Sequence, residues 1–275
     1  MDWLSGYPRT LHLSDSGLPG GRSSRPRLDW SEVSGRHVVL EEKVDGTHSG
    51  LFFDVGGGAH AFSRGTEIDL DVRGGAERRF DAFKDWLEAQ ADALLDRLED
   101  RYALHGEWVK EVHSIYYDRL PHFFLEFDVQ DMESGEFLST QRRKELLDGL
   151  PLASVPVLYE GVAGPAVHPS SFVTKSLFKS PDWRVSCLES AACGGSVARA
   201  LPRKIEDCDL AEGVYGKVEE DGRVVARFKW VREEFVRHIV DGKTHWKSGS
   251  AILNRLAPGA DVLPFPQGPA ISFSR

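Results

Sequence analysis

The stretch Glu42-Lys43-Val44-Asp45-Gly46-Thr47 places a lysine at the end of a predicted strand and directly before a turn. Residues 37–43 are typical of a strand, and Asp-Gly is a strong turn signal. An ordinary lysine has a pKa near ~10.4 and is a solvated cation, so it is a poor nucleophile. In a groove beside other cations its pKa falls, and the amine can then attack an electrophile. The pattern K-x-D-G is short, so its meaning depends on the rest of the chain.

Outward from this lysine, predicted strands outnumber predicted helices. Six further segments combine strand-forming residues with turn signals: 51–55, 59–63, 102–109, 123–129, 212–218 and 224–231. Three segments are predicted as helices: 76–100, 140–147 and 233–240. Residues 14–28 predict a surface loop, residues 151–205 are mixed with little periodicity, and the last dozen residues predict a tail. Hairpin-connected strands favour an α+β fold with antiparallel β-sheets and flanking helices over a doubly wound parallel sheet.

Further short elements follow the lysine in a fixed order. They are Ser63-Arg64-Gly65, a strand that carries Glu107, the aromatic and acidic strand 124–129, Glu212-Gly213-Val214, and Arg227-Phe228-Lys229. In this order they resemble the motifs of the covalent nucleotidyltransferases, which comprise ATP-dependent RNA and DNA ligases and mRNA capping enzymes. The resemblance extends over residues 42–232. Within the superfamily, residues 42–47 and 124–129 are most similar to the RNA ligase 2-like branch.

The resemblance implies an adenylyltransferase domain with an ATP cleft between its β-sheets. It predicts residues 1–232 as this nucleotidyltransferase domain and residues 233–275 as a short C-terminal helical extension and tail. DNA ligases and capping enzymes append an OB-fold after the last motif, and such a domain needs roughly twice the residues that remain after Lys229. The chain is therefore expected to be a near-minimal RNA ligase without an OB-fold.

The implied activity is ATP-dependent sealing of a 5′-phosphate end to a 3′-hydroxyl end of RNA. Lys43 attacks the α-phosphate of ATP, expels pyrophosphate and carries AMP, which passes to the 5′-phosphate before the 3′-hydroxyl displaces it. Charge builds on phosphate oxygens in every step, so cations must converge there. Lys229 and Arg227 are two residues apart on a strand and share one face, from which both can reach the α-phosphate.

The resemblance also implies metal and nucleotide contacts. Mg²⁺ or Mn²⁺ needs oxygen ligands and keeps most of its waters, so one or two carboxylates suffice, and Glu212 and Glu107 are the candidates. For the base, the resemblance predicts that Glu42 accepts a hydrogen bond from the adenine amine and that Phe127 stacks on adenine, with Phe124 as its rival. For the sugar and phosphates, it predicts that Arg64 binds ribose or phosphate oxygens and that Glu107 lies near the ribose. Lys217 is either a phosphate contact or a surface charge.

Two positions depart from the family pattern. His48 stands where ligases and capping enzymes often have Arg and RNA ligase 2-like proteins have Asn, and Arg227 replaces the first lysine of K-x-K. These departures leave the strand type open, so a DNA or mixed DNA/RNA ligase is the first alternative. A GTP-dependent capping guanylyltransferase is disfavoured by the missing OB-fold. A non-catalytic module that binds nucleic-acid ends is disfavoured by the intact Lys43, Glu212 and Lys229.

The charge composition restricts how the chain can bind nucleic acid. It has 275 residues with 34 Lys and Arg against 43 Asp and Glu, a formal net charge of −9, which argues against a passive nucleic-acid binder. RNA or hybrid strand ends are instead expected to lie in a local basic groove, bordered by at least one of four clusters: residues 142–144, Lys175 with Lys179, Arg199 with Arg203 and Lys204, and Lys243 with Lys247 and Arg255.

The expected setting is the cytoplasm. No stretch approaches the ~18 apolar residues of a membrane span, and the first residues have no apolar leader. Three cysteines without C-x-x-C spacing predict free thiols. We expect a monomer, with an end-healing kinase or phosphatase as a partner that prepares the RNA ends.

Overall fold

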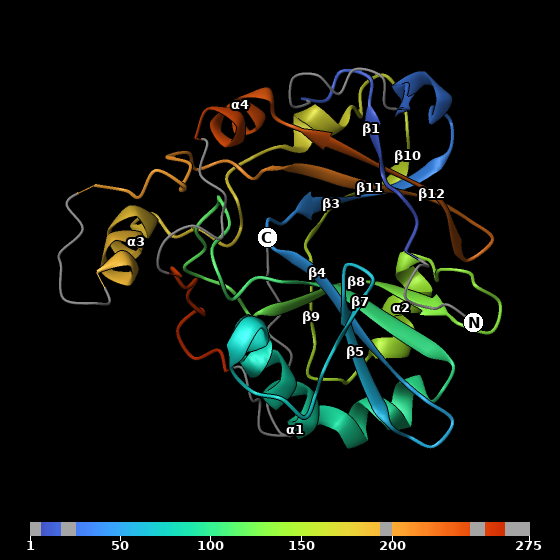
Figure 1. The fold of residues 1–275 in the computed structure, drawn as a ribbon. Helices are drawn as coiled ribbons and strands as arrows, with labels where there is room; N and C mark the ends of the chain where they lie inside the picture. The colour runs from blue at the N-terminus through green and yellow to red at the C-terminus, as the bar shows by residue number, and fades with distance from the viewer. Residues whose placement is uncertain (1–6, 18–25, 193–199, 243–250, 262–275) are drawn as a thin grey trace.

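The computed structural model describes residues 7–17, 26–192, 200–242 and 251–261, and its strands form two six-stranded sheets (Figure 1). Sheet A has the order β10-β3-β11-β12-β1-β2 and comprises β1 (Leu11–Leu13), β2 (Arg27–Leu28), β3 (His37–Lys43), β10 (Val157–Val162), β11 (Gly213–Glu220) and β12 (Arg223–Val231). Sheet B has the order β6-β5-β4-β7-β8-β9 and comprises β4 (Thr47–Phe53), β5 (Ala59–Ser63), β6 (Thr66–Ile68), β7 (Tyr102–Trp108), β8 (Phe124–Asp131) and β9 (Ala153–Ser154).

Helices lie around the two sheets. They are α1 (Asp81–Leu98), α2 (Thr140–Leu147), α3 (Trp183–Ala191) and α4 (Glu233–Gly242), together with the 3₁₀ segments η2 (Trp30–Glu32), η3 (Gly75–Phe80) and η4 (Pro169–Phe172). In Figure 1, α1 lies beside sheet B at the bottom, α4 lies beside sheet A at the top, and α3 stands to the left. None of the helices in the described ranges is long and apolar enough to cross a membrane.

The lysine stretch connects the two sheets. β3 ends at Lys43 in sheet A and β4 begins at Thr47 in sheet B, so the turn predicted at Asp45-Gly46 is a crossing between sheets. Gly46 has no room for a side chain, because a Cβ there would lie 2.7 Å from the carbonyl oxygen of Trp108. The crossing therefore holds Lys43 at the seam where the sheets meet.

The predicted α+β class and the central antiparallel strands are confirmed. The pairs β3–β11, β11–β12, β4–β5, β4–β7 and β7–β8 are all antiparallel. Parallel pairs occur toward the sheet edges, where β1 pairs with β12 and β2, and β8 pairs with β9. The predicted helix over residues 76–100 begins as the 3₁₀ segment η3 and becomes α-helical only from Asp81.

Two hydrophobic cores back the sheets. The larger one packs the apolar side of α1, including Phe83, Trp86 and Leu94, against Leu51 and Leu104 of sheet B. The smaller one lies on sheet A and includes the fully buried residues Leu13, Val38, Leu40, Val214 and Phe228. Each sheet therefore buries one face against its own core, and the other faces are left to form the space between the sheets.

Part of the predicted C-terminal extension packs on the main body. In the segment 251–261, the buried side chain of Asn254 accepts a hydrogen bond from the backbone N–H of Tyr117 at 2.7 Å and donates to the carbonyl of Val109 at 2.6 Å. These bonds satisfy backbone groups in the loop that follows β7. The tail predicted for the last dozen residues lies outside the described residues.

Candidate active site

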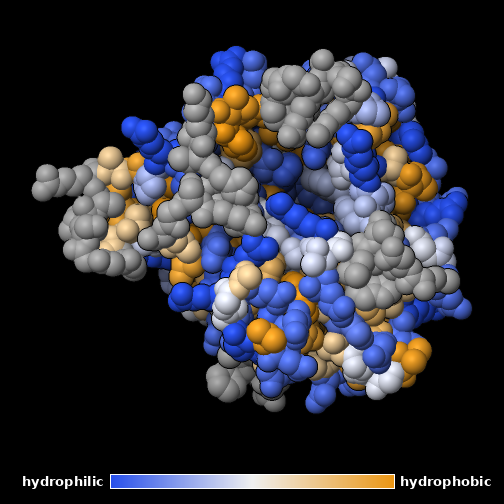
Figure 2. All heavy atoms as spheres, in the orientation of Figure 1, coloured by the Kyte–Doolittle hydropathy of each residue, from blue (hydrophilic) through white to orange (hydrophobic). Residues whose placement is uncertain are grey.

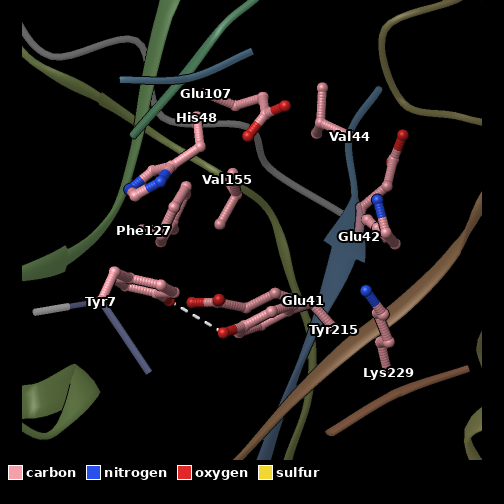
Figure 3. Close-up of a pocket in the computed structure, with 11 residues that line it drawn as sticks. Tyr7, Glu41, Glu42, Val44, His48, Glu107, Phe127, Val155, Tyr215 and Lys229 are labelled. Atoms are coloured by element: carbon pink, nitrogen blue, oxygen red, sulfur yellow. Dashed lines mark hydrogen bonds between the residues drawn. The ribbon is translucent and has the colours of Figure 1, made fainter. Parts of the chain in front are cut away.

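A cavity of about 230 Å³ lies between the two sheets and ends at the lysine. Figure 2 shows a hollow on this side of the molecule, walled largely by hydrophilic residues. Both sheets contribute to the lining, with Lys43, Tyr215 and Lys229 from sheet A and His48, Glu107 and Phe127 from sheet B (Figure 3). The expected cleft between the sheets is therefore present, and we call it the inter-sheet cavity.

Lys43 is held in place by an acidic partner on the neighbouring strand. Lys43 pairs with Gly213 across β3 and β11, and its Nζ donates to Glu212 Oε2 at 2.8 Å. Burial lowers the pKa of Lys43, but the carboxylates of Glu212, Glu107 and Asp45 outweigh that effect and the pKa lies above its ordinary value. The expectation of a lysine activated by nearby cations is therefore wrong for the ligand-free protein, where the amine is an ammonium.

Two carboxylates share the end of the cavity with Lys43. Burial raises the pKa of Glu107 to about 8 and that of Glu212 to about 7, and in both cases the charge of Asp45 contributes to the rise. Glu212 also raises the pKa of Glu107 directly. Carboxylates that repel each other in a buried site favour a bound cation. No group of three or more His, Cys, Asp or Glu residues in the described ranges is placed to hold a metal, but Mg²⁺ needs only one or two carboxylates beside water and phosphate oxygens.

Aromatic rings line the opposite end of the cavity. The half-buried ring of Phe127 lies 5.7 Å from His48 and 6.2 Å from Tyr215, measured between ring centroids. Phe124, the rival for the base-stacking role, is fully buried against Phe83 of α1 at 5.4 Å and belongs to the core. Of the two phenylalanines only Phe127 is placed to meet a ligand in this cavity.

His48 is a neutral residue in this setting. Its Nε2 lies 3.2 Å from Nδ1 of His105, so the two rings share one hydrogen bond. Burial, together with the nearby charge of Arg64, lowers the pKa of His48 to about 4 against the opposing charge of Asp128. His48 thus offers the cavity an uncharged ring where Arg would bring a cation.

Lys229 and Arg227 point to the same face, as their spacing predicts, but only Lys229 lines the cavity. The buried guanidinium of Arg227 donates from Nε and Nη2 to Asp128 Oδ2 at 3.1 and 2.9 Å, and it lies 4.1 Å from the ring centroid of Phe137. The predicted reach of Arg227 to the α-phosphate is therefore wrong for this structure. The positive charge of Arg227 is paired with Asp128 on sheet B instead.

Lys217 is neither a phosphate contact nor a surface charge. Its side chain is 1% exposed, and Nζ lies 2.9 Å from Glu41 Oε2 and 3.2 Å from Asp128 Oδ1. Nζ also donates to the carbonyl oxygen of Phe127. Lys217 of sheet A therefore connects to β8 of sheet B through Asp128 and Phe127.

Arg143 of α2 completes this buried network. Its Nη2 donates to Glu41 Oε1 at 3.0 Å, and its Nε lies 3.4 Å from Glu126 Oε2, with all three side chains at most 2% exposed. We call the following six residues the inter-sheet ion network: Glu41, Glu126, Asp128, Arg143, Lys217 and Arg227. The network joins β3, β11 and β12 of sheet A to β8 of sheet B and to α2.

The carboxylate of Glu42 already accepts hydrogen bonds within the protein. Oε1 accepts a hydrogen bond from Ser176 Oγ at 2.5 Å, and Oε2 accepts one from the backbone N–H of Leu177 at 3.2 Å. Glu42 is 3% exposed, and in Figure 3 its side chain lies on the far side of β3 from Tyr215. Glu42 is still among the residues that line the cavity, so the predicted hydrogen bond from the adenine amine to this carboxylate stays a prediction.

Arg64 lies beside the cavity without lining it. It occupies the turn between β5 and β6 with a left-handed backbone, φ 49°, and lines a second cavity together with Thr47. Its charge still reaches the site, since it lowers the pKa values of Glu107 and His48. Direct contact with a nucleotide in the inter-sheet cavity remains a prediction.

The predicted basic clusters divide between surface and interior. Arg142, Lys144, Lys175 and Arg203 are exposed, whereas Arg143 belongs to the ion network. Lys179 is 4% exposed and donates to the carbonyl of Cys208 at 2.5 Å. Neither Arg143 nor Lys179 can therefore grip RNA. Arg199, Lys243 and Lys247 lie outside the described residues.

Tyr7 and Tyr215 are cavity residues that sequence reasoning missed. The hydroxyl of Tyr7 donates to Asp128 Oδ2 at 2.7 Å and lies 2.8 Å from the hydroxyl of Tyr215 (Figure 3). The ring of Tyr7 lies 4.7 Å from that of His48. Tyr7 stands in an N-terminal segment without a pattern, so no sequence signal marks it, whereas Tyr215 could have been found from its position two residues before Lys217 on a strand facing the cleft.

Comparison with known proteins gives a family match. Residues 36–231 match the RNA ligase family. No curated protein matches the chain. Solved structures that it resembles are a Naegleria gruberi RNA ligase variant with AMP and Mn (15% identity, TM-score 0.49, 84% of this chain and 59% of that one), the same ligase with pyrophosphate (17%, 0.48, 86% and 60%), and an archaeal ATP-dependent RNA ligase (14%, 0.47, 82% and 48%). The chain thus spans less than two thirds of the length of these structures.

Proposed function

The chain belongs to the RNA ligase family, and we propose that it is an ATP-dependent RNA ligase that joins a 5′-phosphate end to a 3′-hydroxyl end through a lysyl-AMP intermediate. The observation that carries the proposal is the position of Lys43. Its amine stands at the seam of the two sheets, 2.8 Å from Glu212, at the end of a cavity whose other end is aromatic. This arrangement suits an adenine at the aromatic end and an α-phosphate beside the amine.

The first chemical step requires Lys43 to lose a proton. Its raised pKa keeps Nζ protonated at neutral pH, and an ammonium has no lone pair with which to attack. Glu212 Oε2 accepts the hydrogen bond from Nζ, and burial makes this carboxylate a stronger base than an exposed one. We assign the proton to this oxygen as the N–P bond forms and the bond from the α-phosphorus to pyrophosphate breaks.

Charge on the phosphate oxygens has two sources of compensation in the cavity. Lys229 on β12 supplies a cation from the wall of sheet A. Glu107 and Glu212 are the residues that would hold Mg²⁺ or Mn²⁺, because they are two buried carboxylates at the end of the cavity where Lys43 lies. When bound, the metal ion neutralises negative charge on phosphate oxygens. Phe127 and His48 would contact the base and Tyr7 would limit how deep it enters.

The test is the intact mass of the protein after incubation with ATP and Mg²⁺ or Mn²⁺. We expect the mass to rise by one AMP, and we expect Lys43→Ala to show no gain while the exposed Lys144→Ala gains as the native chain does. GTP in place of ATP distinguishes a capping guanylyltransferase. The absence of an AMP adduct on the unmodified chain would falsify the proposal.

Strand type and setting are separate parts of the proposal. Sealing of nicked all-RNA, all-DNA and hybrid duplexes distinguishes an RNA ligase from a DNA or mixed-strand ligase, and we expect RNA ends to be preferred. We further propose that residues 1–232 are the adenylation domain and residues 233–275 an extension, which is supported by the start of α4 at Glu233. We also propose that the protein acts in the cytoplasm as a monomer and that an end-healing kinase or phosphatase prepares its RNA ends.

A further inference from the structure

A tyrosine that does not line the inter-sheet cavity holds the turn beside Lys43. Residues 44–46, which we call the lysine turn, connect the end of β3 to the start of β4. The backbone N–H of Asp45, the middle residue of this turn, donates a hydrogen bond to the hydroxyl oxygen of Tyr117 at 2.9 Å. Tyr117 is fully buried, and burial together with the charges of Asp45 and Glu42 raises its pKa well above the usual value. The hydroxyl therefore keeps its proton and is a neutral partner for the turn.

The side chain of Asp45 holds the loop that carries the tyrosine. Its Oδ2 accepts hydrogen bonds from the backbone N–H groups of Ser114 at 2.8 Å and Ile115 at 3.1 Å. Asp45 thus bonds the loop that follows β7 through both its backbone and its carboxylate. Because Lys43 lies only two residues before Asp45, these bonds fix the backbone next to the one from which the amine projects.

Tyr117 is itself held by the C-terminal segment 251–261. Its backbone N–H donates to Asn254 Oδ1 at 2.7 Å, and its carbonyl oxygen accepts a hydrogen bond from the backbone N–H of Arg255 at 2.9 Å. Its ring packs edge-to-face on Phe178, with 5.9 Å between the ring centroids. The backbone, the ring and the hydroxyl of Tyr117 therefore each have a separate partner. A series of direct contacts runs from the C-terminal segment through Tyr117 to the lysine turn.

We propose that Tyr117 is a positioning residue for Lys43, and that the segment 251–261 acts on the reaction through it. The proposal rests on the proposed ligase function. It concerns the step in which the N–P bond forms, pyrophosphate leaves and the amine proton passes to Glu212. This step needs the amine and the α-phosphorus in line, and a displacement of about 1 Å costs about 100-fold in rate even when its cause lies far from the reacting atoms. Because Tyr117 does not line the cavity, it should affect the rate of attack and not the binding of ATP.

The test is Tyr117→Phe, which removes one oxygen atom, with Tyr116→Phe as its matched control. Tyr116 is also fully buried, but its hydroxyl lies 2.8 Å from Ser190 Oγ of α3 and its ring belongs to a separate core. The rate of AMP loading is measured over a range of ATP concentrations at a temperature at which both variants are folded. We expect Tyr117→Phe to lose roughly 10-fold to 100-fold in rate at saturating ATP, with an unchanged half-saturating ATP concentration. Tyr116→Phe should match the native chain in both quantities.

Two kinetic results would overturn the proposal. The first is a native loading rate in folded Tyr117→Phe, because the hydroxyl would then have no effect on the amine. The second is a raised half-saturating ATP concentration with a native maximal rate, because Tyr117 would then serve nucleotide binding. A native chain that loads no AMP overturns the ligase function instead.

Amide hydrogen exchange provides a readout that does not depend on ligase activity. Tyr117→Phe leaves the backbone N–H of Asp45 without its partner, so this amide should exchange about 10-fold faster, whereas Tyr116→Phe should leave it unchanged. Native exchange at Asp45 in Tyr117→Phe would show that the hydroxyl does not hold the turn. Because this measurement stands even if the chain loads no AMP, failure of the proposal and failure of the ligase function are distinguishable.

Asn254→Ala tests the link to the C-terminal segment. It keeps the tyrosine hydroxyl but removes the hydrogen bond to the backbone N–H of Tyr117. We expect a lower loading rate at an unchanged half-saturating ATP concentration, and we expect the double variant with Tyr117→Phe to load no more slowly than Tyr117→Phe alone. Losses that multiply in the double variant overturn the path through Tyr117. If Tyr117→Phe does not fold, Asn254→Ala is compared with Tyr116→Phe, and a native loading rate in Asn254→Ala overturns the proposal.

Discussion

Replacement of Lys217 by methionine tests whether this residue stabilises the fold or contacts the nucleotide. Methionine keeps the length and the apolar stem of lysine but removes the charge. In the native structure the ammonium lies 2.9 Å from Glu41 and 3.2 Å from Asp128 with 1% exposure of the side chain. The variant therefore removes one cation from between two buried carboxylates.

The expected loss is about 3 kcal/mol in the free energy of unfolding. Removal of one partner from a buried ion pair costs about 3–5 kcal/mol, because the other charge stays buried without compensation. The lower end applies here, since Glu41 keeps Arg143 at 3.0 Å and Asp128 keeps Arg227 at 2.9 Å. As a control, Arg36→Met breaks an exposed pair with Glu220 and should cost less than about 1 kcal/mol.

The assay is equilibrium unfolding in urea, followed by AMP loading under conditions in which each variant is folded. We expect Lys217→Met to unfold at lower urea with an unchanged m-value and to load AMP. Burial raises the pKa of Asp128, but Lys217 and Arg227 outweigh burial and hold it below its usual range. This stabilisation is present above the unfolded pKa and is lost as pH falls through the folded one, so the gap between variant and native chain should narrow below about pH 4.

The refuting result is a specific combination. If Lys217→Met unfolds at the native urea concentration and fails to load AMP, Lys217 acts on the nucleotide and the assignment to the ion network is wrong. A double-mutant cycle with Glu41→Gln adds a direct measure of the pair. Coupling close to zero between the two substitutions would also contradict the reasoning.

Three further predictions concern other parts of the structure. Since burial raises the pKa of Glu107 to about 8, the folded protein binds more protons than the unfolded chain between about pH 4.5 and 8; stability should fall as pH rises through this window, and Glu107→Gln should flatten the plot of Tm against pH. Phe127→Ala should raise the KM for ATP in AMP loading with little change in Tm, whereas Phe124→Ala should cost about 3–5 kcal/mol in urea unfolding; equal Tm losses would contradict the division between cavity and core. Asn254→Ala should cost about 2 kcal/mol, because two backbone groups lose their buried partners, and native urea stability would show that this segment is not anchored.

The fold was predictable where strands are regular and closed by a turn. Residues 37–43 match β3 to the residue, and the hairpin at Asp221-Gly222 joins β11 to β12 as predicted. The strand β10 was missed because its burial alternates little and its pairing with β3 is irregular between Val157 and Tyr159. α3 was missed because its apolar residues do not concentrate on one side, and β1 and β2 are short and pair in parallel with distant partners. Tertiary contacts alone define these elements.

Most residues of the site could be predicted from the sequence, but the ion pairs that these residues form could not. Motif order marks Lys43, Glu212 and Lys229, and the structure places all three at one cavity or beside it. The spacing of Arg227 and Lys229 correctly gives them one face. It cannot reveal that Asp128, about a hundred residues earlier on the other sheet, neutralises Arg227. Pairing between distant segments leaves no local pattern.

The inter-sheet ion network also determines how the molecule opens. Its members come from both sheets and from α2, and each carboxylate is compensated by cations from another element. Separation of the two sheets would therefore leave several buried charges without their partners at once. A partial opening would carry the same penalty in free energy. The two sheets should exchange their backbone amide hydrogens as one cooperative unit. A fold made of two layers thus behaves, in its fluctuations, as a single body with its cleft already formed.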